Sequence, residues 1–78
     1  MNTVYLVGYL KTNPVYLNNE CKLDIIIKNT REEVTCMCYG DLAQRVADYC
    51  DIDTLVSVKG RVDIIDGTMY IVAEQVSF

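Results

Sequence analysis

The sequence contains no histidine, no tryptophan, one proline and no long apolar run. Without histidine, the chain lacks the side chain that most often transfers protons near neutral pH, which disfavours catalysis. Its apolar stretches fall short of the ~20 residues that span a bilayer, and its start lacks the charged and apolar regions of a signal peptide. We therefore expect a soluble, cytoplasmic protein that binds a partner, contacts no membrane and is not an enzyme.

What the chain does contain is a large apolar fraction, 51% of 78 residues. This fraction favours a folded domain over disorder, and the length fits one domain over residues 1–78. The four cysteines are Cys21, Cys36, Cys38 and Cys50. Because no secretory signal precedes them and their spacing does not fit zinc patterns, we expect free thiols that pack as small hydrophobes, with no metal and no cofactor.

Three β-rich runs occupy the first half of the chain. Apolar residues alternate with polar ones in much of these runs, as in half-buried strands. The runs are Val4–Leu10, Cys21–Lys28 and Val34–Tyr39. Gly8 removes a side chain inside the first run, which indicates a bulge or the sharp coiling of a small barrel.

The second half predicts one helix and a hairpin. Asp41–Cys50 has helical periodicity, with an expected buried stripe and an N-cap at Asp41 completed by Gln44. The stripe consists of Leu42, Val46, Tyr49 and Cys50. Two further strands follow, Leu55–Ile65 with Gly60 at a bend and Met69–Phe78, joined by a type I′ turn at Asp66-Gly67.

Five short strands with a helix between the third and fourth are typical of the OB barrel, an all-β fold. Closing the sheet removes exposed strand edges, and the helix can cover one open end. An SH3-like barrel is the alternative, although that fold does not ordinarily carry a helix of this length there.

Several segments in the same order resemble bacterial single-stranded DNA-binding proteins. They are Asn2–Leu10 followed by Asn13-Pro14, Tyr39–Ala43 with the helical Val46–Tyr49, Leu55–Val62, and Ile71–Phe78. The primosomal replication protein of the same fold ends its barrel with a similar Ala-Glu-Gln-hydrophobic run. The resemblance covers nearly the whole chain and supports the OB fold.

The resemblance implies sequence-independent binding of single-stranded DNA in replication, recombination or repair. In such proteins, bases stack on aromatic rings and Lys or Arg side chains contact phosphates. The residues expected to bind are Tyr39, Lys22, Lys28, Arg31, Tyr70, Arg61 and Lys11, with Lys59 as a weaker candidate. Two alternatives stay open: Tyr39 packed under the helix, and the lysines as an ordinary solvated strand face.

The first strand is predicted to serve assembly. If Val4, Leu6 and Leu10 fill the core, then Tyr5, Val7 and Tyr9 form an exposed apolar stripe. Such a stripe more often marks a subunit interface than a nucleic-acid site, and the resembling family commonly pairs its first strands. We therefore expect a homodimer or homotetramer.

Some features depart from the family. Glu33 stands where the family often has a second stacking aromatic, the hairpin after the fourth strand is reduced to a tight turn, and the net charge is −4. The carboxylate of Glu33 and the net charge oppose phosphate, and the shortened hairpin removes a loop that wraps DNA in the family, so each departure lowers the expected affinity for DNA. The alternative function is an OB module for protein–protein contact, such as a primosome accessory subunit, with weak or no DNA binding. Acidic residues gathered on the face of Tyr39 would favour it.

Overall fold

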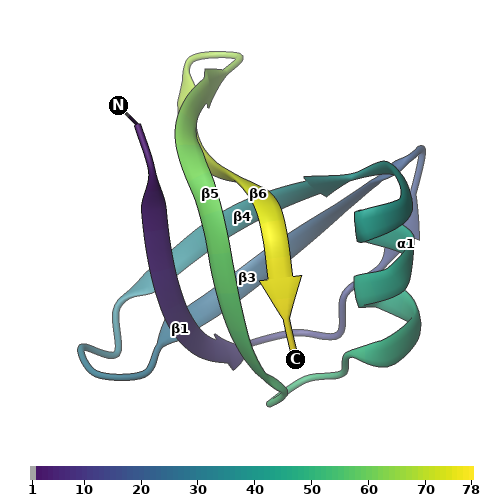
Figure 1. Cartoon of the computed structure of the whole chain (residues 1–78), viewed down its shortest axis with the longest axis horizontal. Helices are drawn as coiled ribbons and strands as arrows, with labels where there is room; N and C mark the ends of the chain where they lie inside the picture. The colour runs from purple at the N-terminus through teal and green to yellow at the C-terminus, as the bar shows by residue number, and fades with distance from the viewer. Residues whose placement is uncertain (1) are drawn as a thin grey trace.

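The computed structural model describes residues 2–78, which form a small barrel of strands with one helix (Figure 1). The elements in chain order are β1 (Val4–Leu10), β2 (Tyr16–Leu17), β3 (Glu20–Ile27), β4 (Glu33–Tyr39), α1 (Gly40–Tyr49), β5 (Leu55–Ile65) and β6 (Thr68–Ser77). No helix within residues 2–78 has the length and apolar character needed to cross a membrane.

The five long strands close on themselves. β1 pairs antiparallel with β5 over Val4–Tyr9 and with β3 over Gly8–Leu10, and the second pairing closes the sheet. β3 continues to β4, and β4 pairs in parallel with β6, which pairs with β5. This closure, with α1 between β4 and β5, confirms the predicted all-β OB barrel.

Two glycines sit where strands cross closely. A Cβ at Gly8 would overlap the Ile26 carbonyl oxygen, at the place where β1 contacts β3 and β5 together. A Cβ at Gly60 would overlap the Val72 carbonyl oxygen, beside the register shift between β5 and β6. Both positions need a residue without a side chain. The register shift beside Gly60 agrees with the bend expected there, whereas the register of β1 runs through Gly8 without a bulge.

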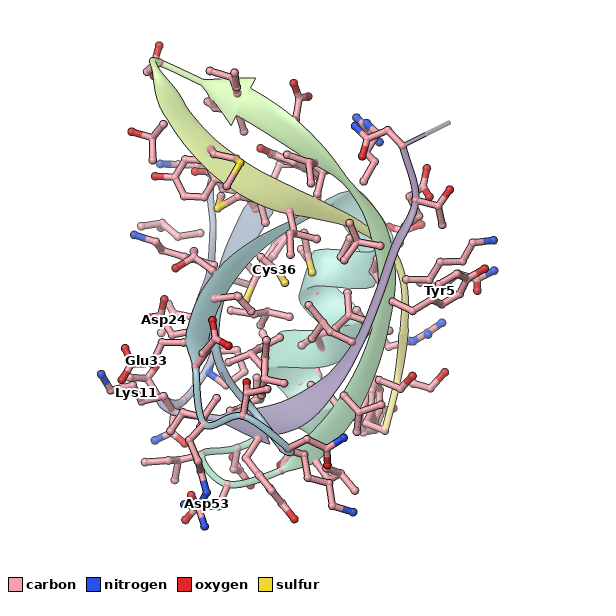
Figure 2. All side chains as sticks on the ribbon, turned by 90° about the vertical axis from the view of Figure 1, so that its left-hand side faces the viewer. Tyr5, Lys11, Asp24, Glu33, Cys36 and Asp53 are labelled. Atoms are coloured by element: carbon pink, nitrogen blue, oxygen red, sulfur yellow. The ribbon has the colours of Figure 1, made fainter. Side chains whose placement is uncertain are left out.

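The barrel core contains the four cysteines together with aliphatic side chains. Cys21, Cys36, Cys38 and Cys50 are all free and buried, as expected. Figure 2 looks along the barrel toward α1 and shows Cys36 inside it. Burial raises the pKa of the Cys36 and Cys38 thiols to about 12, because an apolar interior disfavours the thiolate.

The start of the helix differs from the prediction. The N-cap is Tyr39, in extended conformation and without a side-chain cap hydrogen bond, so the N-cap and capping box predicted for Asp41 and Gln44 are wrong. β4 runs directly into α1, and Gly40 adopts a positive φ of 64° at the junction. Asp41 therefore lies inside the first turn, where its charge still favours the positive end of the helix dipole.

The buried stripe of the helix also differs from the prediction. Tyr49 is 73% exposed, and its ring stacks on Phe78 with 6.3 Å between centroids. Ala43 and Val46 are the buried residues of α1. The helix ends at Tyr49 and Cys50 is already extended, so the last two residues of the predicted stripe do not share one helical face.

The short strand β2 was not predicted from the sequence. It pairs with the start of β3 through a turn at Asn18 and Asn19, both with positive φ. Positive φ at both central turn residues is typical of a type I′ hairpin. The turn predicted at Asp66-Gly67 has the same signature, with φ of 51° and 78°.

Candidate nucleic-acid interface

A groove of about 510 Å³ lies outside the barrel, between the outer face of β3 and β4 and the β5–β6 hairpin. Its lining residues are Val15, Leu17, Asn18, Glu20, Lys22, Met37, Tyr39, Ile65, Asp66 and Tyr70. Tyr39 is 41% exposed and lines this groove, so it is not packed under α1. Alternation along β3 and β4 directs Lys22, Met37 and Tyr39 outward, opposite the core cysteines.

A second hollow of about 380 Å³ shares Lys22 and Tyr70 with the first. It extends between β4 and the end of the hairpin, where Thr35, Met69 and Ile71 contribute to its wall. The two hollows together are called the β3–β4 groove below. It offers aromatic rings and apolar surface along a continuous path outside the barrel, the arrangement that stacking of planar groups needs.

Carboxylates share this groove with Lys22. Glu20 and Asp66 line its first part and Glu33 its second. The Lys11 ammonium donates to both oxygens of Glu33, at 2.9 and 3.1 Å, and Figure 2 shows the pair on the side of the barrel away from Tyr5. This hydrogen bond and the charge of Glu33 raise the pKa of Lys11.

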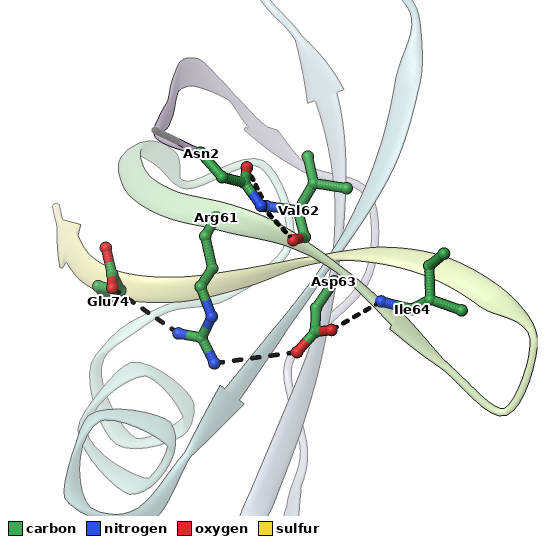
Figure 3. A network of polar contacts seen from close by, with 6 residues as sticks. All are labelled: Asn2, Arg61, Val62, Asp63, Ile64 and Glu74. Carbon is green, nitrogen blue, oxygen red and sulfur yellow. Dashed lines mark hydrogen bonds and ion pairs between the residues drawn. The ribbon is translucent and has the colours of Figure 1, made fainter.

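Arg61, another predicted binding residue, is held between two carboxylates on β5 and β6. Its guanidinium lies 3.9 Å from Asp63 and 3.7 Å from Glu74 (Figure 3). Nearby, the Asn2 side chain donates to the Val62 carbonyl and accepts from the Val62 amide, which fastens the chain before β1 to β5. Arg61 therefore has two carboxylates beside it and lines neither part of the groove.

Lys28 and Arg31 lie elsewhere. They line a separate hollow of about 510 Å³ with Tyr9 and Asp53, whereas Lys22 lies in the β3–β4 groove. β3 ends at Ile27, so Lys28 lies just past the strand, and Arg31 takes a positive φ of 65° in the loop that follows. The single basic track expected from Lys22, Lys28 and Arg31 is thus divided between two surfaces.

The outward residues of β1 are exposed, as the alternation predicts. Tyr5 is 73%, Val7 43% and Tyr9 39% exposed. Lys59 of β5 is the register partner of Tyr5, and its ammonium lies 5.9 Å from the centre of the Tyr5 ring. Figure 2 shows Tyr5 across the barrel from Glu33, whereas Tyr9 lies nearer to it, since Tyr9 pairs with Ile26 and Ile26 pairs with Glu33.

Comparison with solved structures finds proteins of similar fold. The second single-stranded DNA-binding protein of Mycobacterium smegmatis superposes with a TM-score of 0.84 and 25% identity, covering 97% of this chain and 86% of that one. The SSB domain of a Synechococcus protein superposes with a TM-score of 0.76 and 19% identity, covering 100% and 96%. The chain has an SSB-like OB fold. No family model and no curated protein matches the sequence.

The SSB-like fold also brings residues into the groove that the sequence analysis did not select. Met37 alternates with Tyr39 on β4, a signal that could have identified it. Glu20 lies on the outward row of β3, where its register partner is Tyr39. Leu17 reaches the groove because β2 forms a hairpin with β3, and the signal for that hairpin is the Asn18-Asn19 pair. Within residues 2–78, no cluster of His, Cys, Asp or Glu side chains could hold a metal ion.

Proposed function

We propose that this protein binds single-stranded DNA without sequence preference, in replication, recombination or repair, through the β3–β4 groove. The observation that carries the proposal is the meeting of Tyr39, Tyr70 and Lys22 in one groove of an SSB-like barrel. Two rings and a cation are the parts that a strand of stacked bases and phosphates requires.

Stacking would dominate this binding. Bases would stack on the rings of Tyr39 and Tyr70, with Met37 as adjoining apolar surface. Each stacked base contributes ~1–3 kcal/mol, and every base has a flat face, so the contact is independent of sequence. Lys22 would contact phosphate, while Glu20 and Asp66 oppose it. We therefore expect modest affinity with a shallow dependence on salt in the groove.

Fluorescence anisotropy of labelled oligo-dT tests the proposal. Tyr39→Ala and Tyr70→Ala should each raise Kd about 5- to 140-fold, the range that corresponds to one lost stack. Tyr49→Ala is the matched control, because Tyr49 is an exposed tyrosine of α1 that stacks on Phe78 rather than lining the groove. Equal Kd values for all three variants and the wild type would contradict stacking in the groove.

The charge of the same face favours a second candidate function, a module for protein–protein contact. The outward row of β3 and β4 carries Glu20, Asp24 and Glu33, with Lys22 as its one basic residue. A basic partner segment would complement this row. The absence of any oligo-dT binding at about 20 mM salt, where phosphate contacts are strongest, would favour this alternative over DNA binding.

A further inference from the structure

A hollow of about 460 Å³ lies between α1 and the C-terminal half of β6. Figure 1 shows this part of β6 with β5 on one side and α1 on the other. The lining residues of the hollow are Asp41, Leu42, Arg45 and Glu74–Ser77. Tyr49 follows Arg45 by one helical turn and stacks on Phe78, so these two rings extend the hollow toward the end of the helix. We call the hollow and the two rings the α1–β6 groove. It shares no lining residue with the β3–β4 groove.

The edge of β6 that faces this groove has no strand partner. β6 pairs with β4 only at Ile71 and Val72, because β4 ends at Tyr39 and the chain turns into α1. After Val72 the pairing partner of β6 is β5, and Ala73–Phe78 take part in none of the backbone hydrogen bonds found outside helices and strands within residues 2–78. Every second residue of an antiparallel strand directs its N–H and C=O away from its neighbour, so this edge offers unpaired donors and acceptors. An extended segment can pair with them.

The end of the groove offers apolar surface. Tyr49 and Phe78 are 73% and 51% exposed, and their rings stack with centroids 6.3 Å apart and 21° between their planes. Ile52, in the turn after α1, is also half exposed, and its amide donates to the Asn13 side chain at 2.7 Å, which holds that turn in place. Groups already held in one arrangement lose little freedom when a partner covers them. This end of the groove is therefore a place where an apolar side chain of a partner can be buried.

The charge at this end of the helix indicates what such a partner carries. Asp48 lies in the last turn of α1 and Asp51 at the start of the turn that follows, and the last turn of α1 contains no basic residue. The helix dipole makes this end negative, so carboxylates here are unfavourable. Neither aspartate forms one of the ion pairs found within residues 2–78. Their complement is a basic partner, whereas the phosphates of DNA are repelled.

A second copy of the chain is a poorer complement for this groove. Between Gly40 and Asp51, Arg45 is the one basic residue, against Asp41, Asp48 and Asp51. A twofold dimer packs the same patch of each subunit against itself, so it would bring two acidic patches together, which opposes association. Assembly through β1 is compatible with a partner here, because the α1–β6 groove contains no residue of β1.

We propose that the α1–β6 groove binds an extended, basic segment of another protein. The segment adds a strand to the free edge of β6, places an apolar side chain on Tyr49 and Phe78, and directs a lysine or arginine toward Asp48 and Asp51. In this mode of recognition, main-chain hydrogen bonds supply affinity and the side chains supply specificity. The surface differs from the acidic row on β3 and β4, and the proposal does not depend on DNA binding.

A library of random linear peptides, displayed on yeast and screened against the full chain, tests the proposal. The free edge of β6, Ala73–Ser77, is about 17 Å long, so peptides of about 12 residues cover it with both ends to spare. Enriched peptides should contain several Lys or Arg residues and at least one aromatic or aliphatic residue. Failure to enrich basic peptides overturns the proposal. The enriched peptides are then synthesised with a fluorescent label, and anisotropy gives their Kd.

Two double variants locate the bound peptide. Tyr49→Ala with Phe78→Ala removes the rings, and Asp48→Asn with Asp51→Asn removes the carboxylates. Each double variant should raise the Kd for the peptide about tenfold or more, as expected when two central residues of a binding surface are lost. Circular dichroism and thermal unfolding establish that each variant is folded. An unchanged Kd in both folded variants overturns the proposal.

The matched control removes two carboxylates from the other side of the barrel. Glu20→Gln with Glu33→Gln changes the net charge as much as the aspartate variant does, but in the β3–β4 groove. It should leave the Kd for the peptide unchanged. Loss of peptide binding in this control places the peptide on the acidic row of β3 and β4 and overturns the proposal.

N-methylation of the peptide tests the addition of a strand. Two versions of the peptide carry methyl groups on alternate amides, and in an extended segment one of these two sets faces β6. The version whose methylated amides face β6 cannot donate hydrogen bonds to it and should lose binding. Binding that survives in both versions overturns the proposal.

The result is separate from that of the proposed function, because oligo-dT does not enter any of these measurements. Sedimentation of the wild type and of the variant with Tyr49→Ala and Phe78→Ala adds one more outcome. A dimer that these two substitutions dissociate places a second copy in the groove and overturns the proposal.

Discussion

Substitution of Glu33 by a neutral residue should strengthen DNA binding. Its carboxylate lines the β3–β4 groove and also accepts two hydrogen bonds from Lys11. Glu33→Gln removes a negative charge from the groove and releases a lysine whose ammonium lies 2.9 Å from that carboxylate. The substitution therefore leaves an unpaired cation beside the groove without adding a basic residue.

The expected magnitude follows from counterion release. One additional phosphate contact steepens the slope of log K against log salt by about 0.7 for a single strand. Over a tenfold rise in salt, the affinity of Glu33→Gln should therefore fall about fivefold more than that of the wild type. At the low-salt end of the titration, the variant should bind oligo-dT more tightly. Anisotropy titrations at several salt concentrations measure both quantities.

The matched control is the neighbouring residue, Glu32→Gln. Glu32 is exposed in the loop before β4, lines no part of the groove and forms no ion pair within residues 2–78. It carries the same charge, so Glu32→Gln changes the net charge equally. Identical slopes for Glu33→Gln, Glu32→Gln and the wild type would refute the reasoning, because they would mean that Lys11 contacts no phosphate when it is released.

Two further predictions concern the barrel. Gly60→Ala should lower the free energy of unfolding by about 1–3 kcal/mol, because the added Cβ would overlap the Val72 carbonyl. The control is Ser57→Ala, on the exposed side of β5, which should change the free energy of unfolding little. Thermal unfolding of both variants measures the difference. The buried thiols should make stability fall as pH rises above 9 toward about 12, since the folded state retains protons that the unfolded state loses. The slope is about 1.4 kcal/mol per pH unit for each thiol, and urea unfolding of a Cys36→Ala, Cys38→Ala variant should show a flatter one. Equal slopes would contradict this.

The sequence predicted the barrel because its strands have one clear inner side. Cys36 and Cys38 alternate with Thr35, Met37 and Tyr39, and this order alone determines which residues fill the core. The helix start could not be obtained in the same way. An acidic residue after a strand is a common N-cap, but here Gly40 makes the turn from β4 and the helix begins one residue before Asp41.

The residues that line the candidate groove were predicted only in part. Alternation correctly placed Lys22 on the outward side of β3, but Lys28 lies just past the end of that strand and lines a different hollow. In a coiled barrel strand, one side of the strand faces different directions along its length, so residues of one parity reach different surfaces. The pairing of Lys11 with Glu33, across 22 positions, depends on the closure of the barrel and has no local signal.

The net charge of −4 says little about what the β3–β4 groove binds. The barrel measures 30 × 30 × 19 Å, whereas charges are screened over about 8 Å at physiological salt. A bound strand would interact with the residues of one face and not with the whole molecule. Net acidity would act only on approach, by long-range repulsion at low salt. Added salt should therefore speed dissociation, because it weakens the phosphate contacts. It should slow association less than it slows the association of a basic protein with DNA, because here it also screens a long-range repulsion.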